Sequence, residues 1–213
     1  MTSKALILVD LQNDFMPGGN LAVPGGAEVI SVANKLMETS LFDFVVATQD
    51  WHPQNHRSFA SNNPGTKVGE VGKLNDIDQV WWPDHCVQGT WGANFHKDLN
   101  LDKVNAIFRK GTDPEVESYS GFYSSRGPKK GYAPTGLMGY IDDVSVDQVY
   151  ILGLALDYCV KRTAQDCARY STLKTYVILD GCRFVTQDIE NCKKNILEMK
   201  CFNILFLNSD EIK

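Results

Sequence analysis

The chain lacks long hydrophobic runs and blocks of positive charge. The first apolar run ends at Asp10 and is too short for a signal peptide or a membrane span. The formal net charge is -5, from 26 acidic and 21 basic residues, and no Lys/Arg block is longer than the pairs at 129–130 and 193–194. Nucleic-acid binding and membrane binding by charge are therefore disfavoured. These absences predict a soluble protein of the cytoplasm.

Paired cysteines, repeats and low-complexity tracts are also missing. The six cysteines include no C-x-x-C pair, which fits reduced thiols in a cytosolic enzyme better than a disulfide framework. With 43% hydrophobic and 22% charged residues, a chain of 213 residues can bury a sizeable core. No linker divides it, so we expect a single domain over residues 1–213. The sequence does not decide between a monomer and a homo-oligomer.

Short apolar runs alternate with segments of helical periodicity. This alternation predicts one α/β domain with a parallel, Rossmann-like sheet covered by helices on both faces. Residues 60–80 and 112–133 are expected to be long surface loops. A G-x-G-x-x-G fingerprint is absent after the first strand, so no dinucleotide site is inferred. The expected strands are 4–9, 42–48, 101–109, 148–152, 175–179 and 202–206, and the expected helices are 27–37, 134–141, 157–171 and 189–199.

Chemically active side chains follow four of these strands. Asp10 ends the first strand, Asp50 and His52 follow the second, Lys110 the third and Cys159 the fourth. Each alone has an ordinary explanation, such as a loop cap, a solvated surface residue or a small buried thiol. In a parallel α/β sheet, however, ligands bind outside the carboxyl ends of the strands. Their coincidence at one rim therefore predicts a site.

Cys159 is the candidate nucleophile of this site. With Asp157 as the expected N-cap, its thiol lies in the first helical turn, where unpaired N–H groups and the helix dipole favour a thiolate. Asp10 can accept the thiol proton, and Lys110 can offset the negative charge that Asp10 and Cys159 share. Backbone N–H groups of residues 153–156 and of Cys159 can bind an oxyanion.

The pair Asp50-x-His52 predicts a metal site. In an extended segment, residues i and i+2 face the same side, so both side chains can bind one cation. A third ligand must come from His56, His85 or His96, and we prefer His85 because its segment is rich in Trp and Pro. A carboxylate with two imidazoles suits Zn²⁺ with open positions, although Fe²⁺ or Mn²⁺ fits the same set.

These residues lie in long, ordered motifs that span nearly the whole chain. Together they resemble the nicotinamidases of the isochorismatase-like cysteine hydrolase superfamily. Two positions depart from the usual pattern: Glu117 and Gly121 stand where relatives often have Asp and Ala. The motifs are VDLQNDF at 9–15, LAVPGG at 21–26, DWHP at 50–53, WPDHCVQGTWGA at 82–93, KGTDPEVESYS at 110–120 and GLALDYCV at 153–160.

The resemblance assigns roles to individual residues. It implies a catalytic triad of Asp10, Lys110 and Cys159, and a metal bound by Asp50, His52 and His85. It also implies a cis peptide bond before Ala155, with the N–H groups of Ala155 and Cys159 forming an oxyanion hole. Its substrate-binding positions correspond to Phe15, Trp82, Leu154 and Tyr158.

The same resemblance implies hydrolysis of nicotinamide to nicotinate and ammonia through a cysteine thioester, in NAD salvage. One alternative is another small-amide hydrolase of the superfamily. Another is isochorismatase-type hydrolysis of a vinyl ether, which does not require a cysteine nucleophile. A third is a non-catalytic thiol or metal-binding protein, in which Cys159 acts as a sensor and Cys167, about two turns further along the helix, is the nearest thiol.

Overall fold

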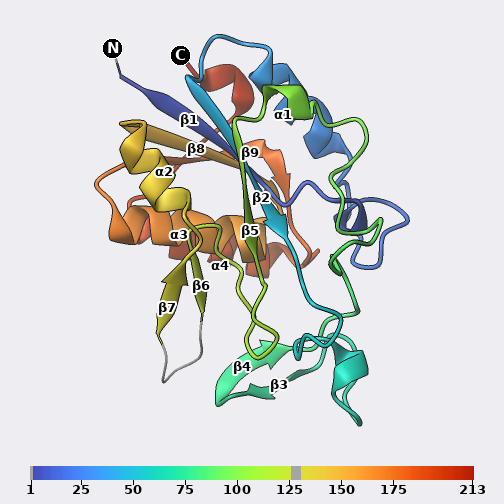
Figure 1. The fold of residues 1–213 in the computed structure, drawn as a ribbon. Helices are drawn as coiled ribbons and strands as arrows, with labels where there is room; N and C mark the ends of the chain where they lie inside the picture. Colours follow the sequence, from blue (N-terminus) through green and yellow to red (C-terminus); the bar gives the residue numbers. More distant parts are fainter. Residues whose placement is uncertain (1, 126–130) are drawn as a thin grey trace.

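The computed structural model describes residues 2–125 and 131–213. A six-stranded sheet, in which every neighbouring pair of strands is parallel, runs through the molecule in the order β10-β9-β8-β1-β2-β5 (Figure 1). This agrees with the predicted parallel α/β sheet. Its strands are β1 (Lys4–Val9), β2 (Phe44–Asp50), β5 (Ala106–Lys110), β8 (Gln148–Leu154), β9 (Lys174–Arg183) and β10 (Leu205–Leu207).

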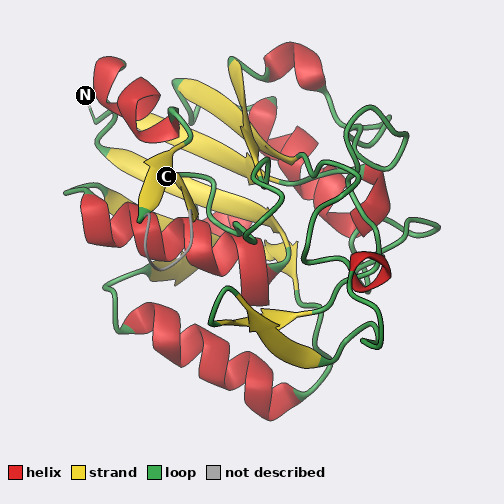
Figure 2. Ribbon diagram, turned by 60° about the horizontal axis from the view of Figure 1, so that its bottom comes forward, coloured by secondary structure: helices red, strands yellow, loops and turns green. Residues whose placement is uncertain are grey.

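Helices lie on both faces of this sheet (Figure 2). Helix α1 packs on β8 and β9, whereas α3 packs on β9 and on its neighbour α4. Their apolar stripes explain this packing: Val29, Ile30 and Ala33 of α1 are buried against the sheet. The helices are α1 (Glu28–Met37), α2 (Leu137–Asp143), α3 (Lys161–Tyr170) and α4 (Ile189–Lys200).

The strand order reverses between β1 and β8. From β1 the chain continues to β2 on one side, whereas from β8 it continues to β9 on the other. Their connections leave in opposite directions, so a crevice opens at the carboxyl ends of these two strands. Gly153 lets the strands approach closely there, because it has φ +135° and an added Cβ would lie 2.2 Å from the carbonyl oxygen of Val9. Asp10 and the segment after Leu154 line this crevice.

The predicted long loop at 60–80 is only partly a loop. It contains an antiparallel hairpin of β3 (Val71–Leu74) and β4 (Ile77–Val80). Gly72 lies against the Trp81 indole, where an added Cβ would come within 2.7 Å of Trp81 Nε1. This hairpin was not predicted because half of its strand residues are exposed and its apolar residues do not alternate regularly with polar ones. Within 112–133, β6 (Tyr123–Ser125) pairs with β7 (Tyr132–Pro134), and residues 126–130 lie outside the described chain.

The excursion from Ala60 to Trp81 is closed at its base. The N–H of Trp82 donates to the Ser58 carbonyl at 2.9 Å, and the N–H of Ala60 donates to the Trp82 carbonyl at 2.8 Å. These two hydrogen bonds form an isolated parallel bridge between Phe59 and Trp82. The chain thus leaves the body of the molecule and returns to it at one fixed point.

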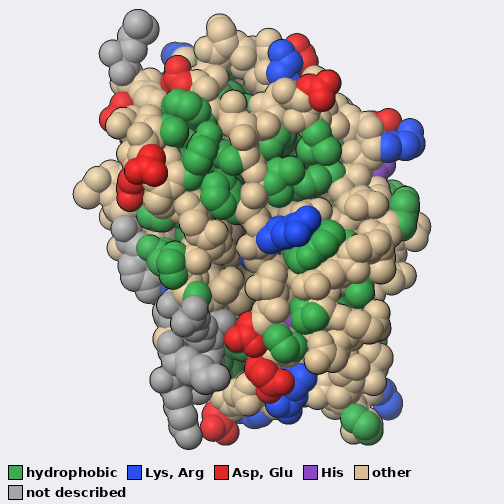
Figure 3. Space-filling view, viewed as in Figure 1, with side chains coloured by type: hydrophobic (Ala, Val, Ile, Leu, Met, Phe, Trp, Pro, Cys, Tyr) green, Lys and Arg blue, Asp and Glu red, His purple; other side chains and the backbone are tan. Residues whose placement is uncertain are grey.

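The centre of the sheet is the core of the molecule. The five residues from Ala5 to Val9 are fully buried, as expected for a strand covered on both faces. On the face shown in Figure 3, acidic and basic side chains are interspersed around groups of hydrophobic ones, and no large patch of one sign forms. In the described part of the chain, no helix has the length and apolar composition needed to cross a membrane.

Candidate active site and metal centre

Three of the predicted residues meet around one buried ammonium group. Lys110, the last residue of β5, places its Nζ 2.9 Å from Asp10 Oδ2 and 3.4 Å from Cys159 Sγ. The same Nζ lies 3.0 Å from Asp50 Oδ1. All four side chains are buried. The structure therefore brings together Asp10, Lys110 and Cys159 from three strand ends, and joins them to the predicted metal site through Asp50.

The Asp10 carboxylate is fixed from two sides. Its Oδ1 accepts a hydrogen bond of 2.7 Å from the Thr48 hydroxyl, whereas its Oδ2 faces Lys110. The backbone of Asp10 has φ 51°, a left-handed conformation that Asp tolerates better than most residues. The chain therefore turns sharply after β1 and presents the carboxylate to the crevice.

Burial and neighbouring charges set the protonation of this group. Burial raises the pKa of Cys159 well above its usual value, and the lowering effect of Lys110 does not compensate. Burial likewise raises the pKa of Asp10, against the lowering effect of Lys110. Burial would lower the pKa of Lys110, but Asp10 and Asp50 outweigh it and keep the lysine charged. These directions favour a thiol for Cys159, beside the Asp10 carboxyl group, over the thiolate expected from the helix end.

Cys159 lies in a tight turn rather than in a regular helix. The peptide bond between Leu154 and Ala155 is cis, as predicted, and a π-helical turn over Leu156–Val160 follows it and leads into α3. The prediction that Asp157 caps this helix is wrong. Its carboxylate instead accepts the N–H groups of Val185 at 3.0 Å and Thr186 at 2.9 Å. Asp157 thereby holds the segment after β9 against the turn that carries the thiol.

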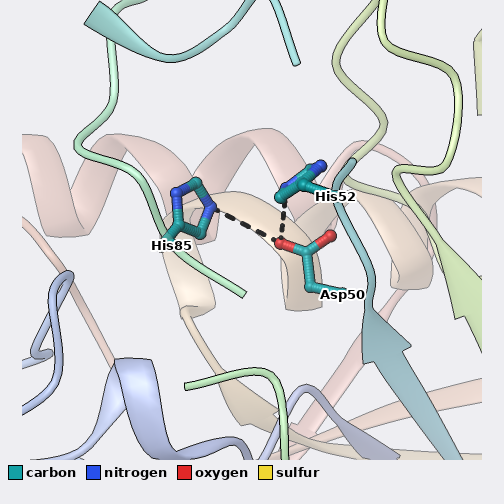
Figure 4. A group of neighbouring side chains, drawn as sticks. All are labelled: Asp50, His52 and His85. Atoms are coloured by element: carbon teal, nitrogen blue, oxygen red, sulfur yellow. Dashed lines mark hydrogen bonds and ion pairs between the residues drawn. The ribbon is translucent and has the colours of Figure 1, made fainter. Parts of the chain in front are cut away.

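The predicted metal ligands Asp50, His52 and His85 converge on one point (Figure 4). Asp50 Oδ2 lies 3.0 Å from His52 Nε2 and 3.6 Å from His85 Nε2. Backbone pairing explains this convergence, because His52 donates its N–H to the Cys86 carbonyl and accepts the N–H of Gln88. A segment more than thirty residues away is thereby held beside the end of β2.

The histidine rings are oriented for a cation. His52 Nδ1 lies 2.8 Å from the Gly111 carbonyl, and His85 Nδ1 lies 2.8 Å from the Pro83 carbonyl. Each neutral ring then carries its proton on Nδ1 and turns the lone pair of Nε2 toward Asp50. Three electron-donating atoms face one another, an arrangement that only a positive charge between them can stabilise. These residues therefore fit a divalent metal ion.

The pKa values of His52 and Asp50 agree with a preference of this group for a bound cation. Burial would lower the pKa of His52, but the carboxylates of Asp50 and Glu117 raise it to about 9. Burial would also raise the pKa of Asp50, yet His52 and Lys110 bring it well below its usual value. Without a metal ion, a proton on His52 supplies the missing positive charge. A divalent ion would take the place of that proton.

A cavity with largely apolar walls adjoins both groups. Trp82, Tyr119 and Tyr158 form one wall, in which Trp82 Nε1 donates to the Tyr119 hydroxyl at 3.1 Å and the Trp82 and Tyr158 rings meet edge to face at 5.0 Å. Such a slot fits a flat aromatic ring. The cavity is lined by Phe15, Leu21, Val23, Asp50, Trp82, His85, Glu117, Tyr119, Ala155, Tyr158, Cys159 and Val185.

Most of the predicted substrate-binding residues line this cavity. Phe15, Trp82 and Tyr158 do so, but Leu154 does not: its side chain is fully buried, packed beneath Gly26. The sequence reasoning missed Glu117 and Tyr119, which follow Lys110 in the predicted loop 112–133. Their signals were their place in the motif at 110–120 and their position after a strand that ends in a catalytic candidate. Leu21, Val23 and Val185 gave no signal, since an apolar residue in a loop is ordinary.

Comparison with known proteins agrees with this architecture. The family model described as the isochorismatase domain matches residues 4–205. The chain belongs to the isochorismatase family. Among curated members, it is 43% identical to a nicotinamidase of Escherichia coli over 93% of this chain and 92% of the relative. It is 45% identical to a nicotinamidase of Acinetobacter baylyi, over 85% of this chain and 81% of the relative.

Solved structures of this family superpose closely on the chain. A nicotinamidase and pyrazinamidase of Acinetobacter baumanii superposes with a TM-score of 0.91 at 39% identity, covering 100% of this chain and 99% of that one. The yeast nicotinamidase bound to the inhibitor nicotinaldehyde has a TM-score of 0.88 at 33% identity, over 96% and 99%. A pyrazinamidase of Pyrococcus horikoshii in complex with zinc has a TM-score of 0.74 at 36% identity, over 97% and 99%.

Proposed function

We propose that this isochorismatase-family chain hydrolyses nicotinamide to nicotinate and ammonia, as a step in NAD salvage. One observation carries the proposal: the Lys110 ammonium contacts Asp10, Cys159 and Asp50 where an aromatic slot meets the candidate metal group. A flat ring in this slot would present its carboxamide to the thiol. The nicotinamidases among the relatives support the same substrate.

The chain's own residues account for the acyl transfer. Cys159 Sγ attacks the amide carbon while its proton passes to Asp10 Oδ2, and the N–H groups of Ala155 and Cys159 bind the developing oxyanion. The C–N bond breaks as Asp10 returns the proton to the departing amine, which leaves as ammonia. Water, deprotonated by Asp10, then hydrolyses the thioester and restores the thiol. Lys110 stays charged throughout and offsets the negative charge of its neighbours.

The proposed metal ligands are Asp50, His52 and His85, and the proposed ion is zinc, with Fe²⁺ or Mn²⁺ compatible with the same donor set. The zinc complex of a related pyrazinamidase supports this choice. When bound, the ion would supply a Lewis-acid contact for the ring nitrogen of the substrate, which orients the ring. The six free thiols fit a reducing compartment, and we propose the cytoplasm.

Pyrazinamide is a second candidate substrate, because one relative at 35% identity is a nicotinamidase/pyrazinamidase of Mycobacterium tuberculosis. Its ring also offers a nitrogen meta to the carboxamide carbon. Benzamide has the same shape without that nitrogen. The three amides therefore separate the fit of the ring from the contact with the metal.

The decisive experiment measures ammonia release from nicotinamide, pyrazinamide and benzamide, with and without a chelator. We expect nicotinamide to be hydrolysed, benzamide to be hydrolysed far more slowly, and the chelator to remove most of the difference. Cys159→Ala should abolish turnover while metal remains bound, and Cys201→Ala, at an exposed thiol, should match the wild type. Full activity in Cys159→Ala, or peroxide-induced disulfide formation without amidase activity, contradicts the proposal.

A further inference from the structure

Two buried polar atoms beside the metal group have no hydrogen-bond partner among the residues that the structure describes. In residues 2–125 and 131–213, only Asp10 Oδ2, His56 Nε2 and Glu117 Oε2 are buried side-chain atoms without a hydrogen bond. Asp10 Oδ2 is accounted for by its ion pair with Lys110. An unpaired buried polar atom costs about 1 to 3 kcal/mol. The orphan atoms of His56 and Glu117 therefore indicate a bound species that pairs with both.

His56 carries its proton on the opposite nitrogen from His52 and His85. The N–H of Ser58 donates to His56 Nδ1 at 3.2 Å, and the Ser58 hydroxyl, 2.8 Å from the same nitrogen, can donate to it as well, so Nδ1 is an acceptor and carries no proton. The proton of the neutral ring is then on Nε2, which is a donor without a lone pair for a metal. The residue is fully buried, and its ring lies against His52 with centroids 4.3 Å apart. His56 can thus donate a hydrogen bond beside the ion but is not set up to ligate it.

Glu117 offers the complementary acceptor. Its side chain is only 6% exposed and lines the substrate cavity. Oε1 accepts the N–H of Ser118 at 2.9 Å and lies 3.8 Å from His52 Nε2, which leaves Oε2 without a partner. Ligand atoms of His52, His56 and Glu117 all lie within 4.8 Å of one another. One water molecule can bridge a donor and an acceptor about 4.5 to 5 Å apart, so these two side chains are close enough for a water molecule to lie between them.

We propose that His56 Nε2 and Glu117 Oε2 bind a water molecule that is itself a ligand of the metal ion. The water accepts the hydrogen bond of His56 and donates one to Glu117, and its remaining lone pair faces the ion held by Asp50, His52 and His85. The inference rests on the metal centre of the proposed function. It makes His56 and Glu117 positioning residues that act on the ion through its water.

The test uses the metal-free protein titrated with Co²⁺ against a competing chelator. Glu117→Gln removes the acceptor charge, and His56→Phe keeps a ring but removes the donor. Each should still bind one Co²⁺ per chain with an affinity about 10- to 100-fold lower, as for other outer-shell partners. His52→Ala, which removes a ligand, should lose far more. Glu115→Gln and His96→Phe are controls outside the metal groups and should match the wild type.

A second readout reports on the water itself. The visible spectrum of the Co²⁺ protein changes with pH as the bound water loses a proton. The Glu117 carboxylate disfavours hydroxide, whereas the His56 N–H favours it. The midpoint of this change should therefore move down in Glu117→Gln and up in His56→Phe. A purely structural role would not move the two midpoints in opposite directions.

Three results would overturn the inference. If either variant loses Co²⁺ as completely as His52→Ala, with altered band intensities at every pH, that residue ligates the ion directly. If both variants keep the wild-type affinity and midpoint, no such water exists although the metal centre stands. If the wild type binds no ion, the water site and the proposed metal centre fail together.

Discussion

The two halves of the crevice, which share Asp50, satisfy their charges in different ways. Around Lys110, one ammonium group forms an ion pair with Asp10 and donates hydrogen bonds to Asp50 and Cys159, so the charges of this half are balanced by protein atoms. Around His52 and His85, both Nδ1 protons go to backbone carbonyls and the lone pairs converge on a carboxylate. The side chains around Cys159 are therefore already paired, whereas the group of Asp50, His52 and His85 needs a cation between its facing lone pairs.

The largest expected effect comes from removing the Lys110 ammonium group, which contacts Asp10, Asp50 and Cys159. Lys110→Met leaves Asp10 and Asp50 buried without their cation, which should lower the free energy of unfolding by about 3 to 5 kcal/mol. Turnover should fall by at least about 10³-fold, as when one member of a catalytic triad is lost. Urea unfolding and ammonia release measure the two effects. Lys97→Met, at an exposed lysine, is the control, and equal stability of both variants would contradict this account.

Replacing a metal ligand should impair zinc binding by Asp50, His52 and His85 and leave the group around Lys110 intact. Zinc at about 1,000 times its dissociation constant stabilises a protein by about 4 kcal/mol, and His52→Ala should lose this stabilisation. The variant should also raise KM, because the substrate ring loses its anchor. Elemental analysis and thermal unfolding with and without zinc provide the measurements, with His96→Ala as the control. Wild-type zinc content in His52→Ala would refute the ligand set.

Metal binding should depend on pH through His52. Below a pKa of about 9, the folded metal-free protein holds a proton on this ring, and an ion must displace it. The apparent zinc affinity should therefore fall about tenfold for each pH unit below about 9. Because the pKa of His52 in the folded protein lies above the usual histidine value of 6.5, the proton stabilises the metal-free fold below about pH 6.5, and this stability is lost as pH rises through about 9.

Chelator competition and unfolding across this pH range test both statements. We expect the zinc-loaded protein to keep its stability where the metal-free protein loses it. An affinity that does not change with pH would mean that His52 is already neutral when the ion binds.

The smallest expected effect concerns the orientation of the base. Thr48→Val keeps the shape of the side chain but removes the 2.7 Å hydrogen bond to Asp10 Oδ1. The loss of such a bond costs about 1 to 2 kcal/mol, or about 5- to 30-fold in kcat/KM. That bond lowers the pKa of Asp10, so its removal should shift the acid limb of the pH profile upward. Thr39→Val, at a helix end, is the control.

The sequence predicted the fold and the convergence of the site well, because both depend on strand ends. Asp10, Asp50, Lys110 and Cys159 each follow a buried apolar run, and parallel topology brings such positions to one rim. His85 was chosen among the remaining histidines for its Trp/Pro-rich surroundings, and the structure places it beside Asp50. Placement could thus be predicted from local patterns.

Partners that depend on three-dimensional packing could not be predicted in this way. Asp157 has the composition of an N-cap, yet its acceptors are used by backbone groups of Val185 and Thr186, almost thirty residues away. Glu117 and His56 lie in polar loops that resemble solvated ones until folding buries them. Burial also reversed the expectation for Cys159, because the cost of a buried thiolate exceeds what the nearby lysine provides.

The backbone bridge at the base of the 60–81 segment makes the positions of the residues after it independent of the length of the segment. Because Phe59 and Trp82 are paired through their backbones, the length of chain between them does not determine where Trp82 or His85 lies. Residues added or removed beyond this bridge change only the entropy of a loop whose ends are already joined, a cost that grows slowly with length. This hairpin can therefore vary in length, while Trp82 and His85, which follow it, stay in register with β2.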